Sequence, residues 1–328
     1  MDNKPAANLD HLNLDHLFVL RPYEKDVTEI IEYSNYSYWG STIRTFLKSK
    51  VGVAGLIIAV FVTLFAILEQ FFPNAAGEIA IGNGYRPYEW IHYLADMSKW
   101  KMPPTALHWF GTDSVGRDCW ARVWYGARIS MLLAIEVSVF EISIGFILGA
   151  VWGYVRWLDK FMLELYNAVM NIPRMIIYVL VMYIMQPSFL TIFVSMSLVG
   201  WLGMAKYTRN LVFIIRDREY NLASRVLGTP ITRIVTKNIL PHLLSVVMLY
   251  LSQLIVSVIG AEVTLTFLGV GLPPEIPSLG VLISEGRTQI NYRPHLLIFP
   301  TLVVALITIS FYVFGNALSD ASDPKNHT

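Results

Sequence analysis

Apolar blocks with few charges recur along the chain, and each is long enough to cross a membrane as a helix. A bilayer core of about 30 Å needs about 20 apolar residues in helical form. The first block, Val51–Leu68, contains no charged residue and predicts the first membrane span. We therefore expect an all-α membrane protein with six transmembrane helices. The five later spans are predicted at 129–155, 161–185, 189–207, 243–265 and 296–318.

The spacing of these blocks also predicts how the chain is organised. A polar extension precedes the first helix, and a long loop with Pro, Gly, Trp and mixed charges separates that helix from the other five. The predicted units are an N-terminal extension (1–45), the first transmembrane helix (46–72), a loop (73–128), a five-helix core (129–318) and a tail (319–328).

Composition agrees with a membrane protein. Hydrophobic residues make up 55% of the chain and charged residues 15%, against roughly 25% charged in an average soluble protein. The single cysteine, Cys119, excludes an internal disulfide and a cysteine-rich metal site. The seven histidines show no metal-binding spacing, and no nucleophile–base set is visible, so we expect no catalytic residue and no metal ligand. Residues 1–45 do not resemble a cleavable signal, so the first span is expected to remain in the membrane.

Positive charges gather between the fourth and fifth predicted spans. Residues 206–241 contain five arginines and two lysines, against only Asp217 and Glu219. Lys and Arg in short loops accumulate on the cytoplasmic side, which predicts that this loop and both termini are cytoplasmic. Three arginines before the second span, at positions 117, 122 and 128, fit this orientation less well. Long loops follow the charge rule poorly, so the orientation is kept.

The basic loop has the local signals of two short helices. Glu219–Leu227 has helical character and stops at Gly228, a residue suited to a helix C-terminus. Thr229 as N-cap and Pro230 in the first turn would then start a second helix, which runs to about Ile239. Composition alone fits a helix pair on anionic lipid equally well.

The order of residues in this loop resembles the EAA loop of ABC importer permeases, whose coupling helix docks in a groove of the ATPase subunit. The resemblance rests on small residues before Gly228 and on the Ile-Leu-Pro ending. Leu222 stands where the motif has Glu, which leaves Glu219 as the nearest acid. The residues assigned to ATPase coupling are Glu219, Ala223, Ser224, Gly228, Thr229, Pro230, Ile239, Leu240 and Pro241.

Two further stretches narrow the resemblance. Phe110–Asp113 with Gly116–Asp118 is similar to the segment before the second span in C-type permease subunits of oligopeptide and dipeptide importers. Phe267–Gly271, followed by Pro273-Pro274, is similar to the loop after the fifth span of the same subunits. The resemblance covers roughly residues 40–325 and implies the type I ABC importer permease fold with cytoplasmic coupling helices.

This family resemblance implies a non-catalytic half-transporter for peptides in a bacterial or archaeal cytoplasmic membrane. Its partners would be a second homologous permease, two ATPase subunits, an extracytoplasmic peptide-binding protein and membrane lipid, with no nucleic acid. No cofactor would be bound by this chain, because ATP and Mg would sit on the ATPase subunits. The Gly111–Asp118 stretch only superficially echoes a P-loop, since it lacks the Lys and Ser/Thr that contact phosphate and Mg²⁺.

Glycines and acids inside the spans are the remaining candidates. Gly145, Gly149 and Gly153 recur every four residues, which lets another helix approach closely. Glu141 continues this stripe and Glu136 points elsewhere on the helix. Intramembrane acids are costly and often functional, so Glu136, Glu141 and Glu262 are either part of the translocation path or structural, with Glu262 a candidate anchor for the following loop. Pro173 is expected to kink the third span.

Two alternatives stay open. A related permease for another solute, such as a nickel chelate, would carry the same motifs. An ion-coupled secondary transporter would use the three intramembrane acids as ion sites, although such carriers usually show paired internal repeats and none is visible here.

Overall fold

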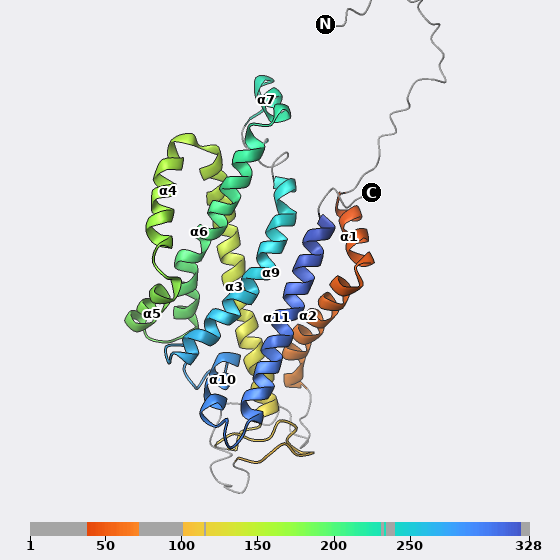
Figure 1. Cartoon of the computed structure of the whole chain (residues 1–328), viewed down its shortest axis with the longest axis vertical. Coiled ribbons are helices and arrows are strands. Elements are labelled where there is room, and N and C mark those ends of the chain that lie inside the picture. The colour runs from red at the N-terminus through yellow and green to blue at the C-terminus, as the bar shows by residue number, and fades with distance from the viewer. Residues whose placement is uncertain (1–37, 72–100, 115, 231–232, 234–239, 323–328) are drawn as a thin grey trace, which may run out of the picture. The chain divides into compact units, whose positions relative to one another are not determined.

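The computed structural model describes residues 38–71, 101–114, 116–230, 233 and 240–322 (Figure 1). Most of the predicted N-terminal extension lies outside this part, as do 72–100 of the predicted loop and 323–328 of the tail. The helices are α1 (Tyr38–Lys48), α2 (Lys50–Leu68), α3 (Cys119–Tyr154), α4 (Arg156–Met170), α5 (Arg174–Met185), α6 (Phe189–Arg216), α7 (Glu219–Val226), α9 (Leu240–Phe267), α10 (Leu279–Thr288) and α11 (His295–Ser322).

The described helices confirm an all-α membrane protein. Five of them are long and apolar enough to cross a membrane: α2 with the 3₁₀ turn that follows it, α3, α6, α9 from Val247 onward, and α11. The sixth predicted span corresponds to α4 and α5 together, which pass the same test as a pair but are bent by 76°. Counting this pair as one broken span gives six.

The break between α4 and α5 lies at Pro173, where a kink was expected. Pro173 has φ −56° and ψ 123° and stands directly before the first residue of α5. A proline inside a helix removes one backbone donor and clashes with the preceding turn, so the chain leaves the helical path here. The predicted helix 161–185 is therefore two helices, and its first part already begins at Arg156.

Several helices extend beyond the predicted spans. α3 begins at Cys119 rather than at 129, because the Asp118 carboxylate accepts a hydrogen bond from the Trp120 N–H at 3.2 Å and caps the helix. α6 continues to Arg216 rather than 207, and α11 continues into the predicted tail as far as Ser322. An apolar block predicts only the part of a helix that lies within the bilayer. It cannot predict polar turns that continue the helix beyond the bilayer.

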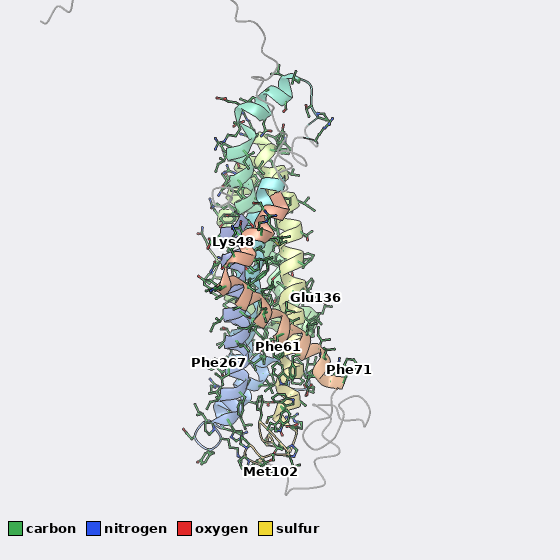
Figure 2. All side chains as sticks on the ribbon, turned by 90° about the vertical axis from the view of Figure 1, so that its right-hand side faces the viewer. Lys48, Phe61, Phe71, Met102, Glu136 and Phe267 are labelled. Atoms are coloured by element: carbon green, nitrogen blue, oxygen red, sulfur yellow. The ribbon has the colours of Figure 1, made fainter. Side chains whose placement is uncertain are left out.

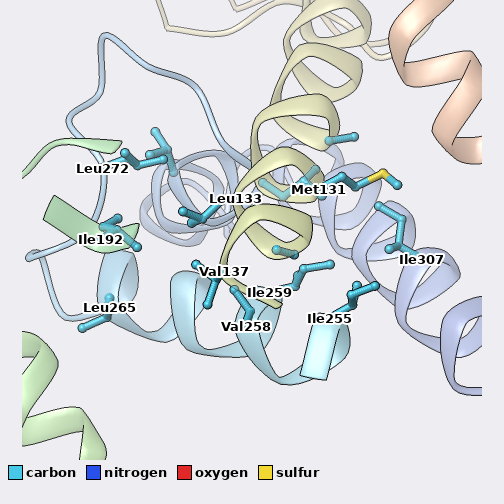
Figure 3. Close-up of a cluster of buried hydrophobic side chains, with 14 of the residues drawn as sticks. Met131, Leu133, Val137, Ile192, Ile255, Val258, Ile259, Leu265, Leu272 and Ile307 are labelled. Atoms are coloured by element: carbon cyan, nitrogen blue, oxygen red, sulfur yellow. The ribbon is translucent and has the colours of Figure 1, made fainter. Parts of the chain in front are cut away.

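α3 lies at the centre of the helical unit, in contact with α2, α4, α6, α9, α10 and α11. Its Leu133 and Val137 are fully buried and meet Ile259 of α9, with Ile307 of α11 nearby in the same cluster (Figure 3). We call the end of this unit that carries α7 the α7 end and the end that carries α10 the α10 end; they lie at the top and bottom of Figure 1.

The outward surface of the long helices is apolar, as lipid contact requires. On α2, Ile57 and Phe61 are each about 60% exposed (Figure 2), while Gly52 and Gly55 face α11 closely enough that a Cβ on either would meet its atoms. α2 is therefore anchored to α11 by its small residues, and its large apolar side chains are free to contact lipid.

Candidate functional site

The short helix α7 follows α6 after a turn, and a buried asparagine joins the two. Asn221 is fully buried, and its Nδ2 donates to the carbonyl oxygen of Ile215 in the last turn of α6 at 2.8 Å. The turn itself is closed by the N–H groups of Arg218 and Leu222, which donate to the carbonyls of Ile215 and Arg218. α7 is thus held at a fixed angle to a membrane-spanning helix.

α7 ends where Gly228 adopts a left-handed conformation, with φ +79°. The Thr229 N–H donates across this turn to the carbonyl of Ser224 at 3.0 Å, which is the six-to-one bond of a Schellman motif. A Cβ at position 228 would meet no atom within 4 Å, so backbone conformation and not space selects glycine there. The helix predicted to follow, up to Ile239, lies almost entirely outside the described residues.

Large apolar side chains are exposed on and just after α7. Val226, the last residue of α7, is 88% exposed, and Leu227, the next residue, is 83% exposed. Leu222, the residue at the position of the expected Glu, is 44% exposed, and Ala223 is exposed beside it. We call Leu222, Ala223, Val226 and Leu227 the α7 tip. Of the other residues assigned to the loop, Glu219, Gly228 and Pro230 are exposed and Ser224 and Thr229 are half-buried, while Leu240 and Pro241 open α9.

The end of α6 that leads into α7 is tied to two other helices by arginine contacts. Arg216, 3% exposed, donates through Nη1 to the Gly153 carbonyl at the end of α3, at 2.9 Å. Arg209 of α6 makes two hydrogen bonds to Asp159 of α4, at 2.8 and 2.6 Å. Trp152 of α3 donates to the same carboxylate at 2.8 Å. No spacing of residues in the sequence indicated this junction of α3, α4 and α6, because α6 lies far from α3 and α4 along the chain.

The glycine stripe of α3 faces the backbone of α6. A Cβ on Gly145 would lie 2.6 Å from the carbonyl oxygen of Trp201, and one on Gly153 would lie 2.8 Å from that of Arg209. A Cβ on Gly149 would overlap the carbonyl oxygen of Ala205. The two helices are therefore in backbone contact over more than two turns, down to the level of α7.

Glu141 continues the same face of α3. Its side chain is 2% exposed, and its carboxylate occupies the space left by Gly200 of α6, where any Cβ would overlap it. Its Oε2 has no hydrogen-bond partner among the described residues. Arg174 of α5 is close enough to act on this carboxylate electrostatically.

Glu136 lies on a different face of α3 and is exposed. Figure 2 shows it between the levels of Lys48 and Phe71, the residues that flank α2, so it lies within the thickness of the bilayer. It lines a shallow groove of about 540 Å³ whose other walls are almost entirely apolar, including Phe140 of α3 and Phe193 of α6. An acid is thus presented within an apolar surface.

Glu262 of α9 is fully buried and surrounded by hydroxyl groups. Ser278, the N-cap of α10, donates to Oε1 at 2.5 Å, and Ser130 of α3 donates to Oε2 at 3.1 Å. A Cβ on Gly280 would lie 2.6 Å from Oε1, so the first turn of α10 rests on this carboxylate. Glu262 joins α3, α9 and α10 and has no exposed surface for a solute in this conformation.

Ion pairs between arginines and acids hold the α10 end together, and the sequence did not indicate that these residues would pair. Arg122, 1% exposed, donates to Asp113 at 2.7 Å and to Glu285 of α10 at 2.8 Å. Arg117 donates to Asp113 at 2.5 Å. Two of the three arginines that disturbed the charge rule are therefore buried structural partners of acids. A cavity of about 370 Å³ lies between Arg122, α10 and the start of α11.

Among the described residues, no group of three His, Cys, Asp or Glu side chains is placed to hold a metal ion. The Gly111–Arg117 loop is used for packing: Gly111 has φ +75°, and a Cβ there would lie 2.6 Å from the Met102 carbonyl. The Asp113 carboxylate accepts from the Arg117 N–H at 2.9 Å. This loop therefore folds onto itself through the Asp113 side chain.

The sequence matches two family descriptions. Residues 142–328 match the binding-protein-dependent transport system inner membrane component, and residues 37–87 match the N-terminal TM domain of oligopeptide transport permease C. The resemblance inferred from the loop motifs is thereby confirmed.

Individual relatives align over nearly the whole chain. The oligopeptide transport system permease protein AmiD of Streptococcus pneumoniae is 37% identical, over 92% of this chain and 94% of its own. The dipeptide transport system permease protein DppC of Bacillus subtilis is 32% identical, over 95% and 93%. OppC of the same organism, an oligopeptide transport system permease protein, is 30% identical, over 90% and 93%. The chain belongs to the family of binding-protein-dependent transport system inner membrane components.

Proposed function

We propose that this chain is the transmembrane subunit of an ATP-driven importer of peptides and forms half of the translocation path. The relatives described above are oligopeptide and dipeptide transport permeases, and the match to DppC covers 95% of this chain. The chain itself performs no catalysis in this proposal. ATP and Mg²⁺ are bound by two separate ATPase subunits, and an extracytoplasmic binding protein delivers the peptide.

The observation that carries the ATPase contact is the α7 tip. Val226 and Leu227, at the end of α7, are each more than 80% exposed and adjoin exposed Leu222, and such an apolar patch favours contact with a partner surface. α7 is braced against α6 by Asn221, and α6 is braced against α3 and α4 by Arg216 and Arg209. A push on α7 by a closing ATPase dimer is therefore passed to three helices. With Leu222 in place of an acid, the contact is more apolar than in the family motif.

The α7 end is the cytoplasmic end in this proposal, and both termini lie on the same side. The charge distribution of the loops supports this orientation, and the buried pairing of Arg117 and Arg122 with acids removes the main objection to it. The α10 end then faces the binding protein.

The exposed position of Glu136 is an argument for a second permease subunit. A carboxylate exposed to lipid in the middle of a span is costly, and the groove around Glu136 is otherwise apolar. A transmembrane helix of the second permease that places a hydrogen-bond donor against Glu136 would remove this cost. We therefore assign the α3–α6 face that carries Glu136 to the contact with the partner permease.

The α7 tip is tested by replacing Val226 and Leu227 with serine in the complete transporter. We expect the ATPase subunits no longer to co-purify with the membrane subunits, or to hydrolyse ATP without peptide uptake. The matched control is Tyr292→Ser, an 89% exposed residue at the opposite end, which should leave ATPase association unchanged. Normal co-purification and uptake in the double variant would contradict the docking role and favour contact of α7 with lipid.

The energy source is tested in cells or proteoliposomes that contain the complete transporter. Peptide uptake should stop when ATP is depleted and should continue when an uncoupler collapses the proton gradient. The opposite result would identify an ion-coupled carrier. Uptake of a nickel chelate but of no peptide would instead identify a related importer with another solute.

A further inference from the structure

Five polar side chains from four helices meet on one face, close to the middle of the long helices. They lie around Gly203 of α6: a Cβ there would be 2.9 Å from the Tyr250 hydroxyl of α9 and 3.3 Å from Nη2 of Arg174. The Tyr250 ring stacks on that of Tyr207 with 6.0 Å between centroids. We call this set the Arg174 cluster; its members are Glu141, Arg174, Tyr178, Tyr207 and Tyr250.

Two glycines of α6 make room for the charged members. The Glu141 carboxylate fills the space in front of Gly200, and the Arg174 guanidinium lies in front of Gly203. The two charged groups are thus placed one helical turn apart on α6, with Tyr178 within the electrostatic reach of both. Bulkier residues at 200 and 203 would remove the acid and the base from this face.

The cluster is incompletely satisfied by the chain itself. Glu141 is almost fully buried, yet its Oε2 has no hydrogen-bond partner among the described residues. Arg174 is exposed; it is hydrogen-bonded to Tyr178 and donates to the sulfur of Met170 at 3.7 Å, a weak acceptor. A guanidinium has five N–H donors in a planar fork that suits carboxylates, so this arginine has donors to offer to another molecule.

The position of Arg174 excludes lipid as the natural neighbour of this face. It lies at the break of the bent pair α4 and α5, two stretches that together are long and apolar enough to enter the membrane. An exposed arginine at that depth is costly in hydrocarbon and is expected to face water or a polar partner. Exposed Tyr207 beside it adds an aromatic surface with a hydroxyl group, which contacts solutes of many side-chain types.

We propose that the Arg174 cluster lines the translocation path and that Arg174 binds the carboxylate of a peptide in transit. This inference rests on the proposed function of the chain. Arg174 is the binding residue, and Glu141 is a positioning residue that holds the guanidinium by charge attraction. Tyr207 and Tyr250 contact the peptide through ring faces and hydroxyl groups. The carboxylate belongs to the C-terminus or to an acidic side chain, and the experiments separate these sources.

The location is tested by cysteine labelling in the assembled transporter. The native Cys119 is buried and can stay in place. Tyr207→Cys should react with a charged, membrane-impermeant thiosulfonate, and peptide with its binding protein should slow the reaction. Leu198→Cys is the matched control, since Leu198 is exposed on the same helix and apolar; in contact with lipid it should not react. An unreactive Cys at 207 in the assembled transporter would overturn the proposal.

The chemistry is tested by transport of three short peptides with a free N-terminus: tri-alanine, tri-alanine amide, and a peptide amide with an aspartate side chain. Arg174→Gln should raise the KM at least tenfold for the peptides with a carboxylate and leave tri-alanine amide unchanged. If the KM rises only for tri-alanine, Arg174 binds the C-terminal carboxylate. If the KM rises equally for the aspartate peptide, Arg174 binds any carboxylate. Arg174→Lys should recover part of the affinity, and Glu141→Gln should give an intermediate KM.

The control for charge removal is Arg44→Gln, an exposed arginine on α1, which should match the wild type for all three peptides. The inference is wrong when Arg174→Gln transports all three with wild-type KM values. The proposed function is wrong when the wild-type complex imports none of them with ATP, so the two failures are distinguishable. If the Arg174→Gln variant does not assemble, the Arg174→Lys variant and the cysteine labelling experiment test the inference instead.

Discussion

The carbonyl oxygen of Trp201 on α6 lies where a Cβ on Gly145 of α3 would come within 2.6 Å of it. Real Cβ atoms do not approach a carbonyl so closely, so the separation of these two helices is set by the absence of a side chain. Gly153 repeats the relationship near α7. The contact lets α6 transmit a displacement of α7 to α3 without flexible side chains in between.

Gly145→Leu should therefore destabilise the subunit strongly. Overpacking of a tight interface costs about 1–3 kcal/mol, and a carbonyl cannot move aside as a side chain can. We expect a lower thermal midpoint in detergent and a smaller yield of assembled transporter. Gly260→Ala on α9 is the control, because a Cβ at 260 meets no atom within 4 Å; it should be neutral or stabilise by up to about 1 kcal/mol. Equal effects of the two changes would contradict the packing argument.

The Arg122–Glu285 pair should be the most sensitive charge contact at the α10 end. Arg122→Met removes the ion-pair partner of Glu285. It also removes one of the two arginines that pair with Asp113, so that only Arg117 remains. Removing one partner of a buried pair costs about 3–5 kcal/mol, reduced here because the Glu285 side chain is 35% exposed. Thermal unfolding of the purified complex measures the loss.

The control for this prediction is Arg156→Met. The Arg156 side chain is 77% exposed and lies 4.0 Å from Asp217, and such surface pairs are worth about 0–1 kcal/mol. A fall in the thermal midpoint as large as that of Arg122→Met would show that burial does not decide the strength of these contacts.

The spans and the glycine stripe were predictable because each depends on residues close together in the sequence. An apolar block such as Val51–Leu68 identifies a span by its length, and glycines every four residues define one helix face. The bend at Pro173 follows from proline chemistry alone. The end of α7 at Gly228 was predictable for the same reason, since a left-handed helix end selects glycine locally.

The contacts that hold the α10 end could not be predicted in this way. Arg122 and Glu285 are 163 residues apart, and Ser130 and Glu262 are 132 apart, so only the folded chain brings them together. α10 itself is ten residues long and of mixed composition, too short for an apolar block. The sequence identified Glu262 as an unusual acid but contained no sign of which hydroxyl groups would surround it.

Glu262 is expected to act as a structural anchor. Glu262→Ala removes the acceptor for Ser130 and Ser278 and leaves a cavity, which together should cost about 3–5 kcal/mol. Glu262→Gln keeps one acceptor oxygen and should cost less. Limited proteolysis of the α9–α10 segment should detect the loosened loop in the Ala variant. A changed peptide preference with unchanged protease resistance would instead place Glu262 in the translocation path.

Gly228 should affect coupling more than global stability. A β-branched residue in the left-handed region costs about 1–3 kcal/mol, whereas Asn is tolerated there, and position 228 has free space for either. Gly228→Val should therefore distort the end of α7 and uncouple ATP hydrolysis from peptide uptake. The thermal midpoint of the membrane subunits should stay nearly unchanged, because α7 packs outside the main helical core.

Gly228→Asn is the matched control and should retain most of the uptake. If Val and Asn behave alike, the conformation at Gly228 does not govern the α7 tip; if Val lowers the thermal midpoint as much as Gly145→Leu does, α7 is part of the folding core.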